Sequence, residues 1–216
     1  MGGGIAEVCA RAGVDVIVFD TGEALIAAGR ERLVKSLERG VGAGRITEGE
    51  RDGAIDKLRF TTSLTDLADR QLVIEAVIED ESIKAGIFSR LDEIVTDPDA
   101  VLATNTSSIP VMKIAAATGN PGRVLGLHFF NPVPVLPLVE LVTTLVTDEA
   151  AAARTEHFAA TVLGKQVVRC SDRSGFVVNA LLVPYLYASP AEHQHTFSGE
   201  GARSLTARAY RLSGAH

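Results

Sequence analysis

One histidine and one glutamate in an apolar stretch have the spacing of a general-base pair. His128 follows the apolar run Val124–Leu127, which reads as a short strand, and three prolines beyond it exclude a helix because proline lacks the N–H group. Leu138–Val142 alternates like a returning strand, which would bring Glu140 back to the imidazole. A carboxylate there would fix the histidine tautomer and stabilise the imidazolium. We therefore predict proton transfer by His128 at a strand's carboxyl end, where open α/β sheets bind ligands, although a lone histidine is more often structural.

The N-terminal residues have the pattern of half a dinucleotide-binding unit. The glycine run that includes Gly2 and Gly4 leads into apolar residues with helical spacing, followed by the near-continuous apolar strand Val14–Phe19 and then Asp20. Glycines at a helix start let a pyrophosphate approach the N–H groups, and an acid after the next strand binds the ribose hydroxyls. Because no arginine follows Asp20, the pattern favours NAD over NADP. Three glycines alone would also fit a flexible terminus.

The remaining chain alternates strands and helices. A long helix is predicted from Thr21 to Arg39, with the glycines at 40, 42 and 44 ending it, and a capping box at Thr47 and Glu50 opens a second helix. Predicted strands, separated by helices, follow at residues 58–61, 72–78, 101–104 and 166–169, and Ser63 and Ser108 are predicted helix caps. This order predicts an α/β fold with a Rossmann-type, mostly parallel sheet and flanking helices.

Composition excludes several classes of protein. The 216 residues carry a net charge of −6, which argues against nucleic-acid binding, and no apolar run approaches the length of a membrane span. Two cysteines without a Cys-x-x-Cys motif fit a reducing cytoplasm, packing roles and no zinc site. His193 and His195 have no third metal ligand beside them, so we expect no metal.

Four sequence blocks, NTSS, GLHFFNPVP, LVELV and SGFVVN, occur in an order that resembles the L-3-hydroxyacyl-CoA dehydrogenase family, and the resemblance covers about residues 1–186. It implies that the protein interconverts 3-hydroxyacyl-CoA and 3-ketoacyl-CoA with NAD in fatty acid metabolism. The implied substrate has a short acyl chain, as in 3-hydroxybutyryl-CoA. The catalytic residues would then be His128, Glu140, Ser107 and Asn179. The same resemblance assigns cofactor contacts to Glu79, Lys84 and Asn105 besides Gly2, Gly4 and Asp20, and substrate contacts to Ser36, Ser107 and Asn131. For Glu79 and Lys84 the alternative is a surface helix pair, and for the basic residues near Ser36 a solvated face.

The two ends depart from the family pattern. The family's glycine motif resembles GxGxMGxGIA, of which only MGGGIA is present. We therefore expect residues 1–186 to form an incomplete NAD-binding domain that lacks the family's first strand. Residues 187–216 are polar and unpatterned where the family has a helical domain, so we expect a disordered tail. Family homodimers form largely through that domain, which argues against dimerisation here.

Two other functions fit the same residues. One is an inactive remnant that retains part of a nucleotide site, and the other is a sister dehydrogenase that oxidises a sugar acid. The free energy lost with a central strand would exceed the net stability of a whole domain, which is about 5–15 kcal/mol. We therefore expect the expressed chain to aggregate and to show little activity.

Overall fold

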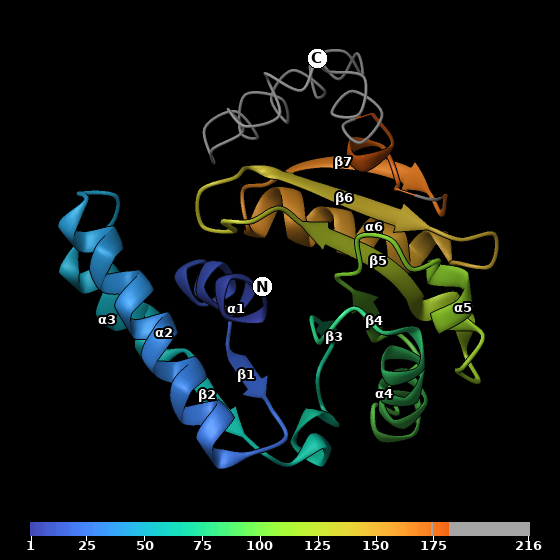
Figure 1. Ribbon diagram of the computed structural model, residues 1–216, viewed down its shortest axis with the longest axis horizontal. Helices are drawn as coiled ribbons and strands as arrows, with labels where there is room; N and C mark the ends of the chain where they lie inside the picture. The colour runs from blue at the N-terminus through green and yellow to red at the C-terminus, as the bar shows by residue number, and fades with distance from the viewer. Residues whose placement is uncertain (174, 182–216) are drawn as a thin grey trace, which may run out of the picture.

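The strands of the computed structural model, which describes residues 1–173 and 175–181, form two sheets (Figure 1). The smaller is a parallel pair, β1 (Val16–Phe19) and β2 (Leu58–Thr61). The larger has the order β3-β4-β5-β6-β7 and is parallel except between β5 and β6. Its strands are β3 (Leu72–Glu75), β4 (Val101–Thr104), β5 (Val124–Phe129), β6 (Leu138–Thr143) and β7 (Gln166–Ser171). The predicted mostly parallel α/β fold of Rossmann type is confirmed.

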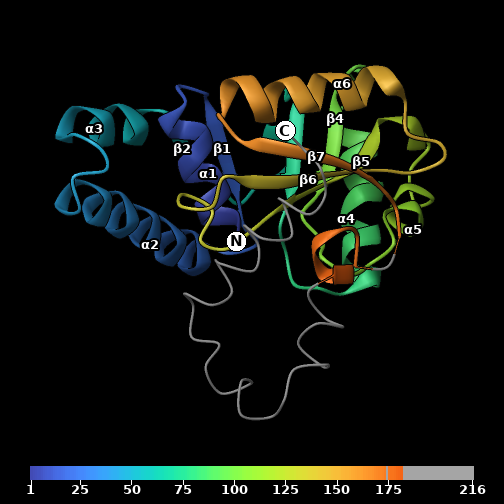
Figure 2. The same ribbon diagram turned by 90° about the horizontal axis from the view of Figure 1, so that it is seen from above.

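Helices cover both faces of the larger sheet (Figure 2). On one face, α1 (Gly2–Arg11), α6 (Glu149–His157) and the π-helical turn η3 (Phe158–Val162) pack on the odd-numbered residues of β4, β5 and β6. On the other, α4 (Glu81–Ile94) and α5 (Val111–Ala115) pack on even-numbered residues such as Leu102, Val124 and Val142. This alternation follows from the period of two along a strand, and it places His128 and Glu140 on the α5 side.

The long α2 (Glu23–Gly42) and the short α3 (Glu48–Asp56) cover the two-stranded sheet. The capping box at Thr47 is present, with Glu50 N–H donating to the threonine oxygen at 3.2 Å. Single turns η1 (Leu64–Leu67) and η2 (Pro121–Arg123) complete the described elements. Leu33 and Leu37 of α2 pack with Ala6 and Ala10 of α1, so α1 contacts both sheets.

Four local predictions are wrong. Gly40 and Gly42 lie inside α2, since an interior glycine costs a helix only about 1 kcal/mol, and the left-handed Gly44 (φ 66°) follows its end. Ser63 makes no capping hydrogen bond. Ser108 does not cap α5 either, because the Asp172 carboxylate accepts from Val111 and Met112 N–H at 2.9 and 2.8 Å. Strand β3 ends at residue 75, three residues before its predicted end.

The facing edges of β1 and β3 are unpaired among the described residues. β1 pairs only with β2, and β3 only with β4, so each strand has one edge without a ladder. Side chains from both strands, including Val16 and Leu72, nevertheless pack on the same core cluster, which contains Ile5, Val8 and Cys9 of α1 and residues of β4, β5 and β6. The two sheets therefore share a core although their strands do not pair.

None of the helices in the described part of the chain combines the length and apolar character needed to cross a membrane. The predicted tail, residues 187–216, lies outside the described residues, as do His193 and His195.

Candidate active site

His128 and Glu140 are register partners in the antiparallel pair β5–β6. His128 is the second-last residue of β5, so the strand is longer than its predicted end at Leu127. The imidazole Nδ1 lies 2.7 Å from Glu140 Oε2, and the glutamate side chain is fully buried. Because a buried carboxylate accepts a hydrogen bond, Nδ1 carries the proton and Nε2 keeps the lone pair.

The second oxygen of Glu140 is also used. Oε1 accepts hydrogen bonds from the Val177 and Val178 N–H groups at 3.0 and 2.8 Å. These amides open the helical residues 178–181, so the carboxylate binds a helix start, where negative charge is favoured. Phe130 and Phe176 flank the imidazole, with ring centroids 4.5 and 5.8 Å away. His128 is therefore oriented by a saturated carboxylate and enclosed by aromatic rings.

A cleft of about 570 Å³ opens in front of His128. Six of the predicted site residues line it: Glu79, Asn105, Ser107, His128, Asn131 and Asn179. They come from the ends of β3, β4 and β5 and from the helical residues 178–181. The structure thus gathers residues that lie up to 100 positions apart at the carboxyl edge of the sheet, where α/β folds bind ligands.

Two amides tie the loop after β4 to its neighbours. Asn105 Oδ1 accepts from Phe129 N–H at 2.8 Å, next to His128. Asn179 Nδ2 donates to the Ser107 carbonyl at 3.4 Å. Ser107 is half-buried at the cleft, as predicted for a side chain free to meet a ligand.

Glu79 is held as a carboxylate by the same loop. Its Oε1 accepts hydrogen bonds from the Thr106 hydroxyl, the Ser107 N–H and the Ser108 hydroxyl. Partial burial alone would raise the pKa of Glu79, but these hydrogen bonds and the charge of Lys84 outweigh it and lower the pKa to about 2. At neutral pH Glu79 therefore carries a negative charge, and Oε2 is its less engaged oxygen.

The start of α1 faces this cleft, because Met1 is among its lining residues. A Cβ at Gly2 would lie 3.7 Å from Ala76, and one at Gly4 would press on Val133 at 3.2 Å, so Gly4 allows close packing. Asp20 follows β1 and is half-buried, with Oδ1 accepting from Thr21 N–H. These positions fit a dinucleotide, with phosphates at a helix start and a ribose beside an acid.

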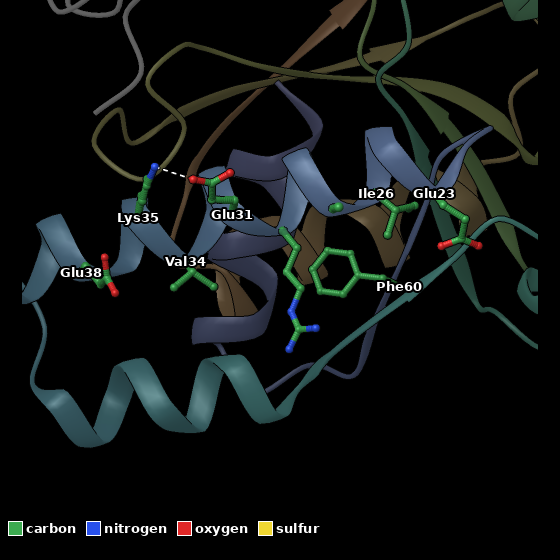
Figure 3. Close-up of a pocket in the computed structure, with 9 residues that line it drawn as sticks. Glu23, Ile26, Glu31, Val34, Lys35, Glu38 and Phe60 are labelled. Atoms are coloured by element: carbon green, nitrogen blue, oxygen red, sulfur yellow. Dashed lines mark hydrogen bonds and ion pairs between the residues drawn. The ribbon is translucent and has the colours of Figure 1, made fainter.

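Lys84 and Ser36 do not line the cleft. Lys84 is 1% exposed and lies behind Glu79. Ser36 is half-buried on α2. Another face of α2 borders a separate hollow of about 590 Å³, where Arg30 lies 5.9 Å from the Phe60 ring (Figure 3). That hollow contains none of the predicted site residues.

Sequence reasoning missed Glu75 and the amides that hold Glu140. Glu75 is buried at the end of β3 and binds Lys84 at 2.8 Å. An acid that closes an apolar strand is a signal that could have found it. In residues 1–173 and 175–181, no three histidine, cysteine or acidic residues are grouped as metal ligands.

The geometry agrees with comparisons to known proteins. A family model described as "3-hydroxyacyl-CoA dehydrogenase, NAD binding domain" matches residues 1–173. A 3-hydroxybutyryl-CoA dehydrogenase of Mycobacterium tuberculosis H37Rv is 77% identical over 189 residues, which are 88% of this chain and 66% of that protein. One from Bradyrhizobium diazoefficiens is 40% identical over 186 residues, covering 86% of this chain and 63% of the relative. The chain thus spans just under two thirds of these relatives.

A solved structure has a similar fold. The crystal structure of M. tuberculosis FadB2 matches with a TM-score of 0.88 and 74% identity, over 92% of this chain and 70% of that one.

Proposed function

The chain belongs to the 3-hydroxyacyl-CoA dehydrogenase family through its NAD-binding domain, and from this premise we propose that it interconverts 3-hydroxyacyl-CoA and 3-ketoacyl-CoA. The observation that carries the proposal is the buried His128–Glu140 pair at the mouth of a cleft that also holds Ser107 and Asn179. A short acyl chain, as in 3-hydroxybutyryl-CoA, is the proposed substrate because the relatives above bear that name.

In oxidation, His128 Nε2 takes the proton of the substrate hydroxyl. Glu140 keeps Nδ1 protonated, so Nε2 offers its lone pair, and the buried carboxylate then balances the imidazolium charge. Bound NAD accepts the hydride that leaves the substrate carbon bearing this hydroxyl group. In the reverse direction the imidazolium returns its proton to the ketone oxygen. His128 is thus base and acid in one site.

Ser107, Asn179 and Asn131 are proposed to orient the substrate. Ser107 and Asn179 line the cleft beside His128, and their polar groups would hydrogen-bond the reacting oxygen or the thioester carbonyl. Ser36 on α2 is the proposed contact for the coenzyme A part. Together these contacts would hold the reacting carbon in line with the base.

Cofactor contacts are proposed for the start of α1, for Asp20 and for the loop after β3. The first-turn N–H groups near Gly2 and Gly4 suit the pyrophosphate. Asp20 would bind the adenosine ribose, and its charge disfavours the extra phosphate of NADP. Glu79 and Asn105 lie on the cleft side, where the nicotinamide ribose would meet them, with Lys84 behind.

The test is turnover of purified protein, followed as NADH absorbance. Acetoacetyl-CoA with NADH should be reduced, whereas gulonate with NAD should give no signal. Gulonate oxidation without acetoacetyl-CoA reduction would overturn the substrate class in favour of a sugar acid. NADPH serves as the cofactor control and should be used poorly.

A nucleotide-binding protein without turnover is the second candidate. Among the described residues, β1 and β3 each have one edge without hydrogen bonds, beside the proposed dinucleotide site, and this favours the second candidate. Enhanced NADH fluorescence with protein, but no oxidation by acetoacetyl-CoA, would identify this function.

Location and assembly complete the proposal. We place the protein in the cytoplasm, acting in fatty acid metabolism, with acyl-CoA and NAD as its small-molecule partners. Sedimentation would show whether the chain forms a homodimer.

A further inference from the structure

A buried ion pair lies behind the cleft, at the carboxyl ends of β3 and β4. Lys84 of α4 is 1% exposed, and its Nζ lies 2.8 and 3.0 Å from the two carboxylate oxygens of Glu75. Glu75 is itself buried, and its carboxylate also accepts from Val77 N–H at 2.6 Å and Thr104 Oγ1 at 2.8 Å. Every acceptor position of Glu75 is thus engaged.

Stability alone is a poor reason for such a pair. Desolvating two charges costs several kcal/mol, on the order of what their attraction returns, so apolar residues of similar shape often stabilise a protein equally well. Glu75 and Lys84 also take no part in the proton transfer proposed above. Their contacts with the cleft residues are therefore the place to seek a role.

Two routes lead from the pair to the loop 105–108. In the first, Lys84 Nζ also lies 3.4 Å from Glu79 Oε2, and Glu79 Oε1 accepts from Ser107 N–H and Ser108 Oγ, both at 3.0 Å. In the second, Thr104 Oγ1, which donates to Glu75, accepts from Thr106 N–H at 3.3 Å. The buried carboxylate is thus linked to both sides of the loop.

We propose that Glu75 is a positioning residue that, through Lys84 and Thr104, fixes the loop 105–108 and the exposed edge of Glu79 for cofactor binding. Lys84 is 1% exposed, and its ammonium lies between the carboxylates of Glu75 and Glu79. Glu79 Oε2, held by Lys84 alone, is the oxygen left to accept from a ribose hydroxyl. The inference rests on the proposed function only in that NADH is the ligand used to probe it.

Glu75→Gln is the decisive variant, because it keeps the shape of the side chain and removes its charge. Amide exchange of residues 105–108 should rise about tenfold without any ligand, as expected for losing a hydrogen bond to a charged group. The dissociation constant of NADH, measured by fluorescence titration, should rise by about the same factor.

The matched control is Glu7→Gln. Glu7 is also buried, lies 3.8 Å from Arg11 within α1, and makes no contact with the loop. It should leave loop exchange and NADH affinity unchanged. Thr104→Val is a milder second variant that keeps both charges and removes only the bridging hydroxyl, so exchange should rise about threefold. It also decides the matter should Glu75→Gln fail to fold.

A double variant, Glu75→Gln with Lys84→Met, separates positioning from stability. Removing both charges should restore the melting temperature lost in Glu75→Gln while loop exchange and NADH affinity stay impaired. Recovery of all three would show a merely structural pair and overturn the inference, as would unchanged loop exchange in folded Glu75→Gln and Thr104→Val. If wild-type protein binds no NADH but loop exchange responds as stated, the proposed function fails and the positioning role stands.

Discussion

The two sheets differ in how completely their strands are enclosed. In β4, β5 and β6 nearly every residue is buried, and each strand is hydrogen-bonded on both edges. In β1 every residue is only half-buried, and its single ladder joins it to β2. The enclosed sheet carries the His128–Glu140 pair, and the open one carries Asp20. The proton-transfer residues are therefore fixed by a dense scaffold, whereas the dinucleotide side depends on contacts through α1.

The largest effect should come from removing the base. His128→Ala should lower turnover about 10²–10⁴-fold while leaving NADH binding nearly unchanged, because His128 is not among the proposed cofactor contacts. Asp20→Asn is the counterpart in the open sheet and should weaken NADH binding with turnover at saturation preserved. Absorbance assays and fluorescence titrations measure the two. More than half the wild-type activity in His128→Ala would remove this residue from the mechanism.

Glu140→Gln should lower turnover about a hundredfold or more, since a neutral amide cannot stabilise imidazolium and would donate to Nδ1, placing the proton on Nε2. Its carbonyl can still accept from Val177 and Val178 N–H, so the fold should persist by circular dichroism. Glu156→Gln, at an exposed ion pair with Arg169, is the control and should be silent. Equal turnover in Glu140→Gln and wild type would contradict the pairing.

Core truncation should separate the sheets by stability. Leu102→Ala in β4 removes a fully buried side chain and should cost about 2–5 kcal/mol. Val18→Ala in β1 removes a smaller, half-buried one and should cost about 1 kcal/mol. Urea unfolding of both variants gives the difference. Equal losses would mean that β1 is as firmly enclosed as β4.

Acid should reveal the charge held at the mouth of the cleft. The pKa of Glu79 lies at about 2, below its ordinary value of 4.5, so the folded state favours the carboxylate. Its contribution to stability is therefore complete above about pH 4.5 and is lost as the pH falls towards 2. The stability difference between wild type and Glu79→Gln, measured by denaturation at pH 6 and pH 3, should shrink at the lower pH. A constant difference would contradict the hydrogen bonding described for Glu79.

The smallest response is expected from the two thiols. Burial raises the pKa of Cys9 to about 12, and burial with the charges of Glu140 and Asp172 raises that of Cys170 to about 12. At pH 8 both should react with a disulfide reagent roughly a thousandfold more slowly than a free thiol. Faster labelling of Cys9 than of Cys170 would show that α1 opens more readily than β7.

The His128–Glu140 pair was predictable because local rules suffice for it. The apolar run Val124–Leu127 and the alternation along Leu138–Val142 predicted two strands, and a short proline loop between them leaves an antiparallel return as the simple connection. The strands around them and the capping box at Thr47 followed from similarly local patterns.

What failed depends on partners far along the chain. Ser108 looked like a cap, but Asp172, more than 60 positions later, takes the N–H groups of α5 and leaves Ser108 to bind Glu79. The contacts of Glu140 with Val177 and Val178 likewise cross 37 and 38 positions. Sequence periodicity describes one element at a time, so competition between distant acceptors for the same donors escapes it.

The double engagement of Glu140 couples two equilibria. One carboxylate serves both the imidazole and the amides that open residues 178–181. A protonated His128 interacts with the negative charge of that carboxylate, and the amides of Val177 and Val178 bind the same charge. By thermodynamic reciprocity, protonation of the imidazole changes the free energy of docking by the same amount as docking changes the free energy of protonation. The acid–base chemistry of the histidine is thus tied to the docking of the segment that carries Asn179.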